Sequence, residues 1–355
     1  MKLFITGICG FVGSSLADCL LERHENLSIC GIDNLMRRGS EMNRARLQEL
    51  GITFIHGDLR AASDFENLPK ADWVIDAAAN PSVLAGVQQG FSSRQLFEHN
   101  LASLVNVLEY CKAQDAGLVL LSTSRVYSIP ALRSIPLKEE NKAFRLDDSN
   151  PLPQGATVRG IGTSFSTEPP ISLYGSTKLA SEAIALEYGC AFDFPVWVNR
   201  CGVLAGPGQF GTPDQGIFSY WINAHLRRRP LRYIGFGGTG KQVRDALHPR
   251  DLAELLDRQI RSGRSHGRRL YSAGGGPENS MSLAELTEWC DQRFGPHIPI
   301  ADQRARTYDI PWLVVDNNEA ESDFDWRPNI PMKEILSQIA CHAERNPGWL
   351  ERSGV

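Results

Sequence analysis

A tyrosine and a lysine four residues apart are the side chains best suited to proton chemistry in this sequence. Tyr174 begins the segment Tyr-Gly-Ser-Thr-Lys, and Lys178 ends it. The pattern predicts a helix from Tyr174 to Tyr188, on which this spacing places both side chains on one face. The ammonium would then favour the phenolate and lower the tyrosine pKa from its usual value of about 10. An ordinary amphipathic helix would carry the same pair without doing chemistry.

A hydroxyl at the end of an apolar run is the natural companion of this tyrosine. Thr123 lies in Ser-Thr-Ser-Arg-Val-Tyr, directly after the run Leu-Val-Leu-Leu. There it could hydrogen-bond the oxygen of an alcohol. Tyr174 could take the proton of that alcohol while hydride leaves the same carbon.

Three glycines near the N-terminus are typical of a dinucleotide-binding turn. Gly7, Gly10 and Gly13 follow an apolar run and precede a helical pattern from Ser14 to Arg23. Such glycines allow a tight turn and a close approach to a pyrophosphate, which rests on the helix N-terminus. Asp33 ends the next apolar run, where a carboxylate binds both ribose hydroxyls of NAD and repels the 2′-phosphate of NADP. The alternative is that the glycines only turn the chain and that Asp33 caps a loop.

Two arginines near this turn leave the choice between NAD and NADP open. Arg37 and Arg38 could accommodate the 2′-phosphate of NADP, although Asp33 would lie closer to the ribose. Asp58 could contact adenine or could be a surface turn carboxylate. The alanines at positions 77–79 would let a cofactor lie flat on a strand end.

The elements that must position these residues alternate along the first 200 residues. Six short runs rich in β-branched residues read KLFITG, SICGID, TFIHGD, WVIDAAA, LVLLSTS and VWVNR, with helix-compatible segments between several of them. This alternation predicts a doubly wound parallel sheet of the Rossmann type, with a smaller α/β substrate-binding lobe. We expect residues 1–199, with 240–266, to form the NAD-binding domain. Residues 200–239 and 267–355 would form the lobe.

Two later segments stand out from this alternation. Residues 128–172 are rich in Pro, Gly, Ser and charge, and a segment of this length without regular pattern usually indicates either a function or disorder. We expect it to lie over the substrate cleft. A helical stretch is predicted from Pro249 to Ser262.

Composition narrows the class of protein. The chain has 355 residues, 42% of them hydrophobic, and a formal net charge of -4, so it can bury a large core and lacks an overall basic field for nucleic acid. The eight cysteines are scattered singly, without disulfide or zinc-site spacing. We expect no metal, no membrane span and a cytoplasmic location.

The motifs together resemble one family. The G-x-x-G-x-x-G start, the ST-x-x-VY strand end, YGSTK and the later RDALH are similar to extended short-chain dehydrogenases/reductases that remodel nucleotide sugars. The resemblance implies that Tyr174 is the acid/base, that Lys178 tunes it and orients the nicotinamide ribose, and that Thr123 holds the sugar hydroxyl. The residues it assigns to NAD are Gly7, Gly10, Phe11, Val12, Gly13, Asp33, Asn34, Arg38, Asp58, Leu59, Ala77, Ala78, Ala79, Asn100, Tyr174, Lys178 and Arg200.

The resemblance also separates reaction types within the family. Its sugar dehydratases carry an Asp-Glu pair directly after the threonine, where this chain has Ser124 and Arg125. Neither replaces a carboxylate, so dehydration is disfavoured and redox with return of the hydride is favoured. The helix bearing Tyr174 and the one around Phe91 to Gln114 would form a homodimer contact.

The substrate end rests on three further segments. Residues 208–216, 240–248 and 279–283 are similar to family members that invert C2 of a CDP-hexose. A guanidinium at Arg244 suits the substrate pyrophosphate, although a salt bridge with Asp245 or Asp251 would also explain it. The residues assigned to the nucleotide sugar are Ser124, Arg125, Gln209, Asp214, Gln215, Gln242, Arg244 and Arg306.

Several residues are expected to be structural or to limit the resemblance. His248 is interpreted as a structural histidine. Trp221, Trp312 and Trp326 are interpreted as core side chains. Val203 and Ala205 stand where the family usually has Asn and Tyr, which changes the expected shape of the nicotinamide pocket.

The expected reaction is transient oxidation of a hexose carbon to a keto sugar and its reduction from the other face, at C2 of a CDP-hexose. A UDP-hexose 4-epimerase or related oxidoreductase would use the same residues. A non-catalytic NAD-binding regulatory protein is the third hypothesis, but it would not need Thr123, Tyr174 and Lys178.

Overall fold

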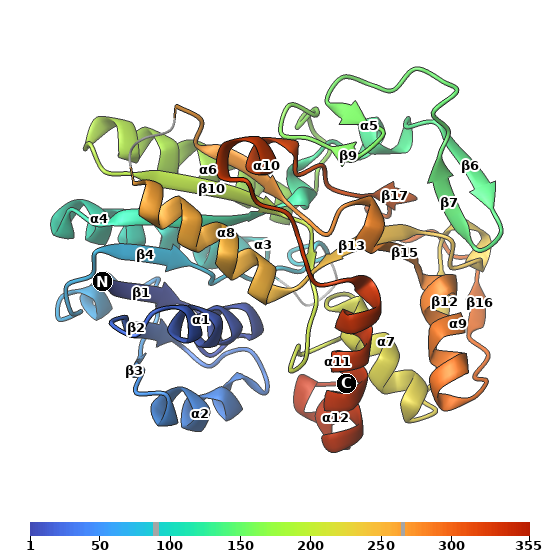
Figure 1. Ribbon diagram of the computed structural model, residues 1–355, viewed down its shortest axis with the longest axis horizontal. Coiled ribbons are helices and arrows are strands. Elements are labelled where there is room, and N and C mark those ends of the chain that lie inside the picture. The colour runs from blue at the N-terminus through green and yellow to red at the C-terminus, as the bar shows by residue number, and fades with distance from the viewer. Residues whose placement is uncertain (88–91, 264–266) are drawn as a thin grey trace.

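A seven-stranded parallel sheet forms the larger part of the molecule in this computed structural model, which describes residues 1–87, 92–263 and 267–355 (Figure 1). In spatial order the strands are β14 (Leu270–Ala273), β10 (Val196–Cys201), β5 (Gly117–Thr123), β4 (Trp73–Asp76), β1 (Lys2–Thr6), β2 (Ser28–Asp33) and β3 (Thr53–His56). The six apolar runs predicted as strands all lie in this sheet. Because its strands are parallel, their carboxyl ends meet at one edge, where ligands bind in such folds.

Helices cover both faces of the large sheet, which confirms the Rossmann-type α/β fold. Over one face lie α1 (Phe11–Arg23), α2 (Asn43–Glu49), α8 (Pro249–Ser262) and α10 (Asn318–Phe324). On the other side are α3 (Ser93–Phe97), a π-helical turn (Glu98–Ala102), α4 (Ser103–Gln114) and α6 (Leu173–Ala191). Each face has its own apolar core. The helix predicted at Pro249–Ser262 has those bounds, while the expected homodimer helix begins at Phe91, which lies outside the described residues.

A second group of elements forms the smaller part of the molecule. Its four-stranded sheet contains β11 (Val203–Leu204), β13 (Val243–Leu247), β15 (Ser280–Ser282) and β17 (Trp312–Leu313). Beside it lie α7 (Ile217–Leu226), the pair β12 (Arg232–Ile234) and β16 (Ile300–Asp302), α9 (Leu283–Phe294), α11 (Met332–Arg345) and α12 (Trp349–Ser353). Helices α7, α9 and α11 share one apolar core.

The domain boundaries expected from the sequence need two corrections. β14 lies in the range 267–355 that was expected to belong to the lobe, yet it pairs with β10 at the edge of the large sheet. β13 lies in the range 240–266 expected to belong to the NAD-binding domain, yet it joins the smaller sheet. Short strands of three to five residues carry too little pattern to reveal their partners. The remaining division into two lobes stays a proposal.

Residues 128–172 form short regular elements joined by turns and irregular stretches, and none of them lines the central cavity. The segment forms α5 (Ile129–Arg133), β6 (Leu137–Glu140), β7 (Ala143–Leu146), β8 (Ala156–Thr157) and β9 (Gly160–Ile161). Its apolar side chains, including Ile129, Leu132 and Phe165, pack with Trp312 and Val314. The expectation that it lies over the substrate cleft is therefore wrong, because these apolar residues bury the segment against Trp312 and Val314 and away from the cavity lining.

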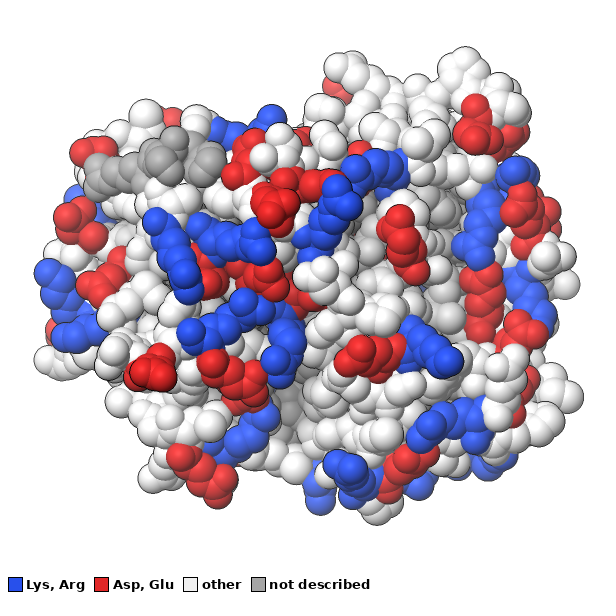
Figure 2. All heavy atoms as spheres, viewed as in Figure 1, with Lys and Arg blue, Asp and Glu red and all other residues white. Residues whose placement is uncertain are grey.

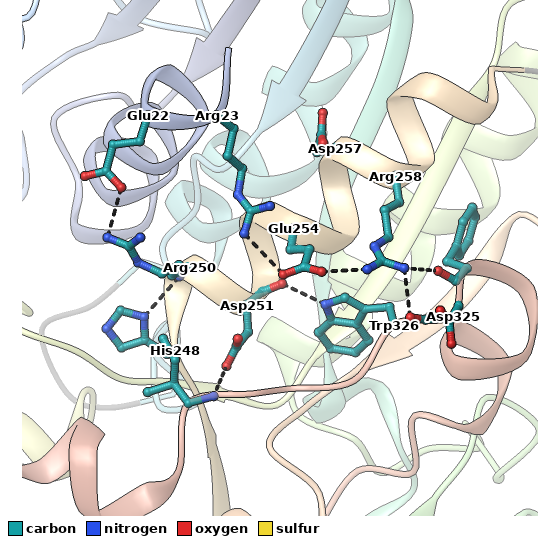
Figure 3. Close-up of polar contacts among 12 residues, drawn as sticks. Glu22, Arg23, His248, Arg250, Asp251, Glu254, Asp257, Arg258, Asp325 and Trp326 are labelled. Carbon is teal, nitrogen blue, oxygen red and sulfur yellow. Dashed lines mark hydrogen bonds and ion pairs between the residues drawn. The ribbon is translucent and has the colours of Figure 1, made fainter.

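Helix α8 joins the N-terminal part of the chain to its C-terminal part (Figure 3). Arg250 pairs with Glu22 of α1 at 2.9 Å. Arg258 donates to the carbonyls of Phe324 and Asp325. The face seen in Figure 2 accordingly shows basic and acidic side chains interleaved. These contacts fix the segment that leads into α11 against the Rossmann core.

Helices of the described part of the chain are all too short or too polar to cross a membrane.

Candidate active site

A cavity of about 1070 Å³ lies between the large sheet and the smaller lobe. That is slightly above the range of about 300–1,000 Å³ that is typical for pockets of single small molecules, which suits a cofactor and a substrate together. The residues assigned from the sequence that line it are Gly7, Gly10, Phe11, Val12, Gly13, Asp33, Asn34, Asp58, Leu59, Ala77, Ala78, Ala79, Thr123, Ser124, Arg125, Tyr174, Gln209, Asp214, Gln215, Gln242, Arg244 and Arg306. Arg38, Asn100, Lys178 and Arg200 do not line it.

The glycine turn at one end of the cavity leaves no room for side chains. Gly7 has φ +64°, and a Cβ there would lie 2.9 Å from the Cα of Ala78. A Cβ on Gly13 would lie 2.3 Å from the carbonyl oxygen of Gly7. The chain therefore turns directly from β1 into α1, and the first residues of α1, Phe11 and Val12, line the cavity. This is the cradle that a dinucleotide pyrophosphate requires.

Asp33 ends β2 at the wall of the same cavity. Its carboxylate accepts hydrogen bonds from the backbone N–H groups of Cys9 (3.0 Å) and Leu35 (2.8 Å). Burial raises its pKa, and these backbone hydrogen bonds oppose the rise. The carboxylate is thus held at the strand end where it can accept the ribose hydroxyls of NAD.

The two arginines that left NADP open differ in their surroundings. Arg38 is exposed and does not line the cavity, with its Cδ next to Gly354, and its assignment to the cofactor stays a prediction. Arg37 lines the cavity, but its guanidinium donates to the side-chain oxygen of Gln215 (3.0 Å) and to the carbonyl of Phe210. Both groups belong to the loop after β11, so Arg37 is not held ready for a 2′-phosphate.

Asp58 is engaged in a local ion pair. Its carboxylate receives two hydrogen bonds from the Arg60 guanidinium, at 2.9 and 2.6 Å, and one from the amide of Asn34 at 3.3 Å. The bonds from Arg60 hold the pKa of Asp58 well below its ordinary value. Asp58 is therefore ionised at the cavity wall, near the place expected for adenine.

Asn100 and Arg200 are buried outside the cavity, which corrects their assignment to the cofactor. The Asn100 amide accepts from the N–H of Asn80 (2.7 Å) and donates to its carbonyl (3.0 Å), so it fixes a residue of the cavity wall. Arg200 forms a buried pair with Glu182 of α6 at 2.7 Å. One feature of the sequence indicated the pairing of Arg200 in advance, because a charged residue within an apolar strand needs a buried partner.

Tyr174 and Thr123 meet at the carboxyl end of β5. Tyr174 is in the first turn of α6, which begins after Ser172, and its side chain is 6% exposed. Burial raises the pKa of Tyr174 to about 12, against the effect of a hydrogen bond from Thr123 and of the nearby Arg125 cation. The predicted meeting of these two hydroxyls is found in the structure.

Lys178 does not act on the tyrosine as the spacing suggested. It is buried below the cavity, where burial lowers its pKa and the carboxylates of Asp76 and Glu182 oppose this. Arg125, not Lys178, is the cation that favours the phenolate of Tyr174. The structure does not bear out the prediction that Lys178 lowers the tyrosine pKa, since the charges that act on its ammonium are those of Asp76 and Glu182, which the sequence did not reveal.

Arg125 lies directly against the start of α6. A Cβ on Gly175 would come within 2.3 Å of the Arg125 carbonyl oxygen, so only glycine lets the helix approach this closely. Burial lowers the pKa of Arg125 to about 9, and the neighbouring Arg244 adds to the effect. Together with Ser124 it occupies the position next to Thr123, and no carboxylate stands there.

The other end of the cavity is rich in arginine. Arg244 in β13 donates to the carbonyl of Ile310 (2.8 Å) and lies 3.6 Å from the Asp309 carboxylate. Arg306 pairs with Asp214 at 2.8 Å. A cluster of guanidinium groups at this depth is suited to a pyrophosphate.

The alternative salt bridges of Arg244 are not those formed. The buried Asp245 instead accepts from the N–H of Gly276 at 3.1 Å, and burial raises its pKa to about 6. Asp251 accepts from the N–H of Ile330 at 3.1 Å. Both carboxylates hold backbone segments together.

The glutamines assigned to the substrate orient the cavity wall. Gln242 donates to the carbonyl of Ile234 (2.9 Å) and to Asp309 (3.2 Å), and Gln209 donates to the carbonyl of Leu204 (2.7 Å). Gln215 accepts the hydrogen bond from Arg37 described above.

The residues interpreted as structural are so placed, with one addition. His248 caps α8 by accepting from the N–H of Arg250 at 3.1 Å. Trp312 and Trp326 are buried in the core. Trp221 is also buried, stacked on Tyr233 at 5.5 Å, yet its edge reaches the cavity wall. Val203 lines the cavity, whereas Ala205 is buried behind it.

Tyr308 is one of several cavity residues that sequence reasoning missed. Tyr308 lines the cavity from the smaller lobe and packs against the small cluster formed by Val83, Leu84 and Tyr174. Its sequence neighbour Arg306 was the residue of that segment assigned to the substrate. Nothing local distinguishes a functional tyrosine from any other aromatic residue in an irregular stretch.

A doubly wound sheet, a glycine turn with Asp33, and Thr123 beside Tyr174 define an NAD-binding enzyme of the extended short-chain dehydrogenase/reductase type. Residues 3–274 match the model of the "NAD dependent epimerase/dehydratase family", and the chain belongs to that family. NAD is the cofactor of this family, and the glycine cradle with its Asp33 acceptor fits that cofactor. The chain is accordingly an enzyme, and the hypothesis of a non-catalytic regulatory protein is not retained.

Individual relatives extend the likeness over the whole chain. The chain is 28% identical to the CDP-paratose 2-epimerase of Salmonella typhi, across 96% of this chain and 98% of that protein. It is 27% identical to UDP-glucuronate 4-epimerase 1 of Arabidopsis thaliana, across 96% of this chain and 76% of the relative. Among solved structures, the UDP-glucuronic acid 4-epimerase of Bacillus cereus has a TM-score of 0.73 at 21% identity, covering 97% of this chain and 99% of the other, which supports the fold.

Proposed function

We propose that this protein is an NAD-dependent nucleotide-sugar epimerase that inverts C2 of a CDP-hexose. The observation that carries the proposal is the pair of Tyr174 and Thr123, placed in one cavity between the glycine turn and the arginines of the smaller lobe. A substrate whose pyrophosphate lies at Arg244 and Arg306 would extend its hexose toward Tyr174.

Each residue has a distinct task in this proposal. NAD, when bound, supplies an acceptor that takes hydrogen from the hexose carbon and later returns it. Thr123 positions the reacting hydroxyl, and Tyr174 takes its proton and gives it back in the second half-reaction. Arg125 stabilises the phenolate that Tyr174 carries before it takes the proton and again after it has given the proton back. The keto sugar turns within the cavity before it is reduced from the other face.

The neighbourhood of Thr123 argues against a dehydratase. Elimination of water needs a base that removes a proton from carbon and an acid that protonates the leaving hydroxyl group. Ser124 and Arg125 stand beside Thr123 and supply neither at neutral pH. A reaction that only exchanges hydrogen between the hexose and the cofactor needs no further carboxylate.

The choice of carbon and nucleotide follows the likeness to the CDP-paratose 2-epimerase of Salmonella typhi. It is supported by the three segments at 208–216, 240–248 and 279–283, of which the first two contribute Gln209, Asp214, Gln242 and Arg244 to the cavity. The second candidate is a 4-epimerase of a UDP-hexose, favoured by the likeness to UDP-glucuronate 4-epimerase 1 of Arabidopsis thaliana.

We further propose that the protein acts as a cytoplasmic homodimer. The helices expected to form the contact, α4 and α6, pack side by side, with Tyr188 bonded to Glu109 at 3.0 Å. The large apolar side chains Phe97 and Val105 are 39% and 38% exposed on α3 and α4, as a helix face that meets a second copy would be. All eight cysteines lie within the described residues and carry free thiols, which suits a reducing compartment.

Turnover assays across nucleotide sugars test the proposal. Purified protein is incubated with CDP-, UDP-, GDP- and dTDP-hexoses, CDP-paratose among them, and the products are identified by NMR spectroscopy. We expect a C2 epimer from the CDP-hexose without added cofactor, because NAD that is regenerated in each turnover can remain bound. A C4 epimer from a UDP-hexose, with no product from CDP-hexoses, would overturn the choice of carbon and nucleotide. Light scattering tests the dimer, and a monomer at micromolar concentration would contradict it.

A further inference from the structure

Tyr308 adopts a backbone conformation that its side chain makes unfavourable. Its φ is +60°, in the left-handed region where a Cβ crowds the backbone and glycine is favoured. Residues in such conformations persist only where their surroundings impose them, and they gather at functional sites. The position therefore calls for a reason why a large aromatic residue stands there instead of glycine.

Side chains from other segments form hydrogen bonds with the two residues that follow Tyr308. Arg133, at the end of α5, donates to the carbonyl of Asp309 from two nitrogens, at 2.9 and 2.7 Å. Arg244 donates to the next carbonyl, that of Ile310, at 2.8 Å. The Asp309 carboxylate accepts from the N–H of Ile310 (3.0 Å) and from Gln242 (3.2 Å). These contacts come from two separate elements, α5 and β13 with the residue before it, and hold the turn in its strained form.

The held turn directs Tyr308 to the chemical end of the cavity. The half-buried ring packs against the cluster of Val83, Leu84 and Tyr174, which belongs to the Rossmann side of the molecule. It thus crosses from the smaller lobe to the wall that carries the acid/base. Within residues 1–87, 92–263 and 267–355 its hydroxyl forms no hydrogen bond, so packing is its only contribution to the folded chain.

We propose that Tyr308 is a specificity-determining residue that closes the hexose end of the cavity and confines the keto sugar between the two half-reactions. This inference rests on the proposed function. In the first half-reaction the carbon loses hydrogen to the cofactor, and the hydroxyl proton passes to Tyr174. In the second, both return to the turned sugar. Between them the ring must rotate without leaving, so a wall of fixed position beside Tyr174 is needed.

The variant Y308G separates this role from a purely structural one. Glycine suits the positive φ, so we expect the melting temperature to stay level or rise. Epimerisation should nevertheless fall about tenfold or more, the scale on which one lost apolar contact in a pocket acts. Keto sugar should appear in solution in an amount equal to the cofactor that remains reduced, measured by mass spectrometry and by the absorbance of reduced nicotinamide.

Two matched variants complete the experiment. Y308F keeps the ring and should keep both the rate and the retention of the keto sugar. D325G makes the same kind of backbone change at another left-handed position, φ +49°, beyond the cavity. It should leave the rate unchanged.

The outcomes are distinguishable. A stable Y308G protein with the wild-type rate and no released keto sugar would overturn the inference and leave the proposed function intact. Loss of rate and of keto-sugar retention in Y308F would also overturn it, because the hydroxyl rather than the wall would then matter. A wild-type protein that epimerises no nucleotide sugar would instead overturn the proposed function. If Y308G melted well below the wild type, the turn would depend on the ring for folding, and the inference would fail.

Discussion

The two ends of the cavity are positioned by different kinds of contact. At the cofactor end the backbone sets the geometry: Gly7 and Gly13 allow contacts that no side chain could occupy, and Asp33 is held by two backbone N–H groups. At the substrate end, side chains from segments far apart in the chain set it, as when Arg133 and Arg244 grip consecutive carbonyls. Most of the first arrangement forms within the unit β1-α1-β2, with Ala78 after β4 packed against Gly7, whereas the second exists only after the whole chain has folded.

This difference predicts separable effects of mutation, with the largest where the two ends meet. Tyr174→Phe removes the group that exchanges the hydroxyl proton, so turnover should fall by at least about 10²-fold. The protein should retain NAD, because the glycine turn and Asp33 are untouched. Steady-state kinetics and mass spectrometry of the intact protein check both. Wild-type turnover in the folded variant would remove Tyr174 from the mechanism.

A change at the substrate end should leave the cofactor end unaffected. Arg244→Gln removes a charged donor at the expected pyrophosphate position, and charged hydrogen bonds contribute about 1.5–3 kcal/mol. KM for the nucleotide sugar should therefore rise about tenfold or more, with the NAD content unchanged. Arg244→Lys is the matched control and should recover part of the loss through its charge. Loss of NAD from either variant would show that the two ends are not independent.

The converse change acts at the cofactor end alone. Asp33→Ala should weaken NAD binding and reduce the preference for NAD over NADP. The ribose of NAD loses its hydrogen-bond acceptor, and the 2′-phosphate of NADP no longer meets a repelling carboxylate. Isothermal titration with both dinucleotides measures this. If the wild type binds NADP better than NAD, Asp33 does not determine the choice of dinucleotide. Arg37 would then have to break its hydrogen bond to Gln215 and bind the 2′-phosphate.

A smaller effect concerns the pH dependence of stability. Burial raises the pKa of Asp245 from 3.8 to about 6 in the folded chain. The protonated form is thus favoured by folding, and its contribution is complete below about pH 4 and lost as the pH rises through about 6. Asp245→Asn should remove this dependence, with a change of about 2–3 kcal/mol across that window. Denaturant unfolding at several pH values measures it, and parallel profiles for the two proteins would contradict the assignment.

The contrast between the ends also explains what the sequence could foretell. The glycine turn, Asp33 and the six central strands follow from local patterns, because backbone constraints leave a mark on neighbouring residues. The Tyr174 and Thr123 pair was found because both residues lie at ends of recognisable elements. The effect of Lys178 was misjudged, since Asp76 and Glu182 are its neighbours only in space.

Long-range contacts escaped prediction for the same reason. Arg200 pairs with Glu182, 18 positions earlier, and so does not line the cavity expected to hold the cofactor. The segment 128–172 was expected over the cleft, yet its apolar residues pack with Trp312 and Val314 of the smaller lobe, and Arg133 donates to the carbonyl of Asp309 at the cavity wall. Tyr308 depends on that same arginine. No pattern within a short window contains such partners.

Isotope labelling tests the central claim, transient oxidation at C2, most directly. A CDP-hexose deuterated at C2 should keep its label in the epimer and react more slowly if that hydrogen's transfer limits turnover, and no solvent deuterium should enter in heavy water. A sugar deuterated at C4 should react at the ordinary rate. Deuterium from heavy water at the inverted carbon would contradict the account, because inversion would then proceed by deprotonation. A slowed C4-deuterated sugar would keep the roles of Tyr174 and Thr123 but replace the 2-epimerase with a 4-epimerase.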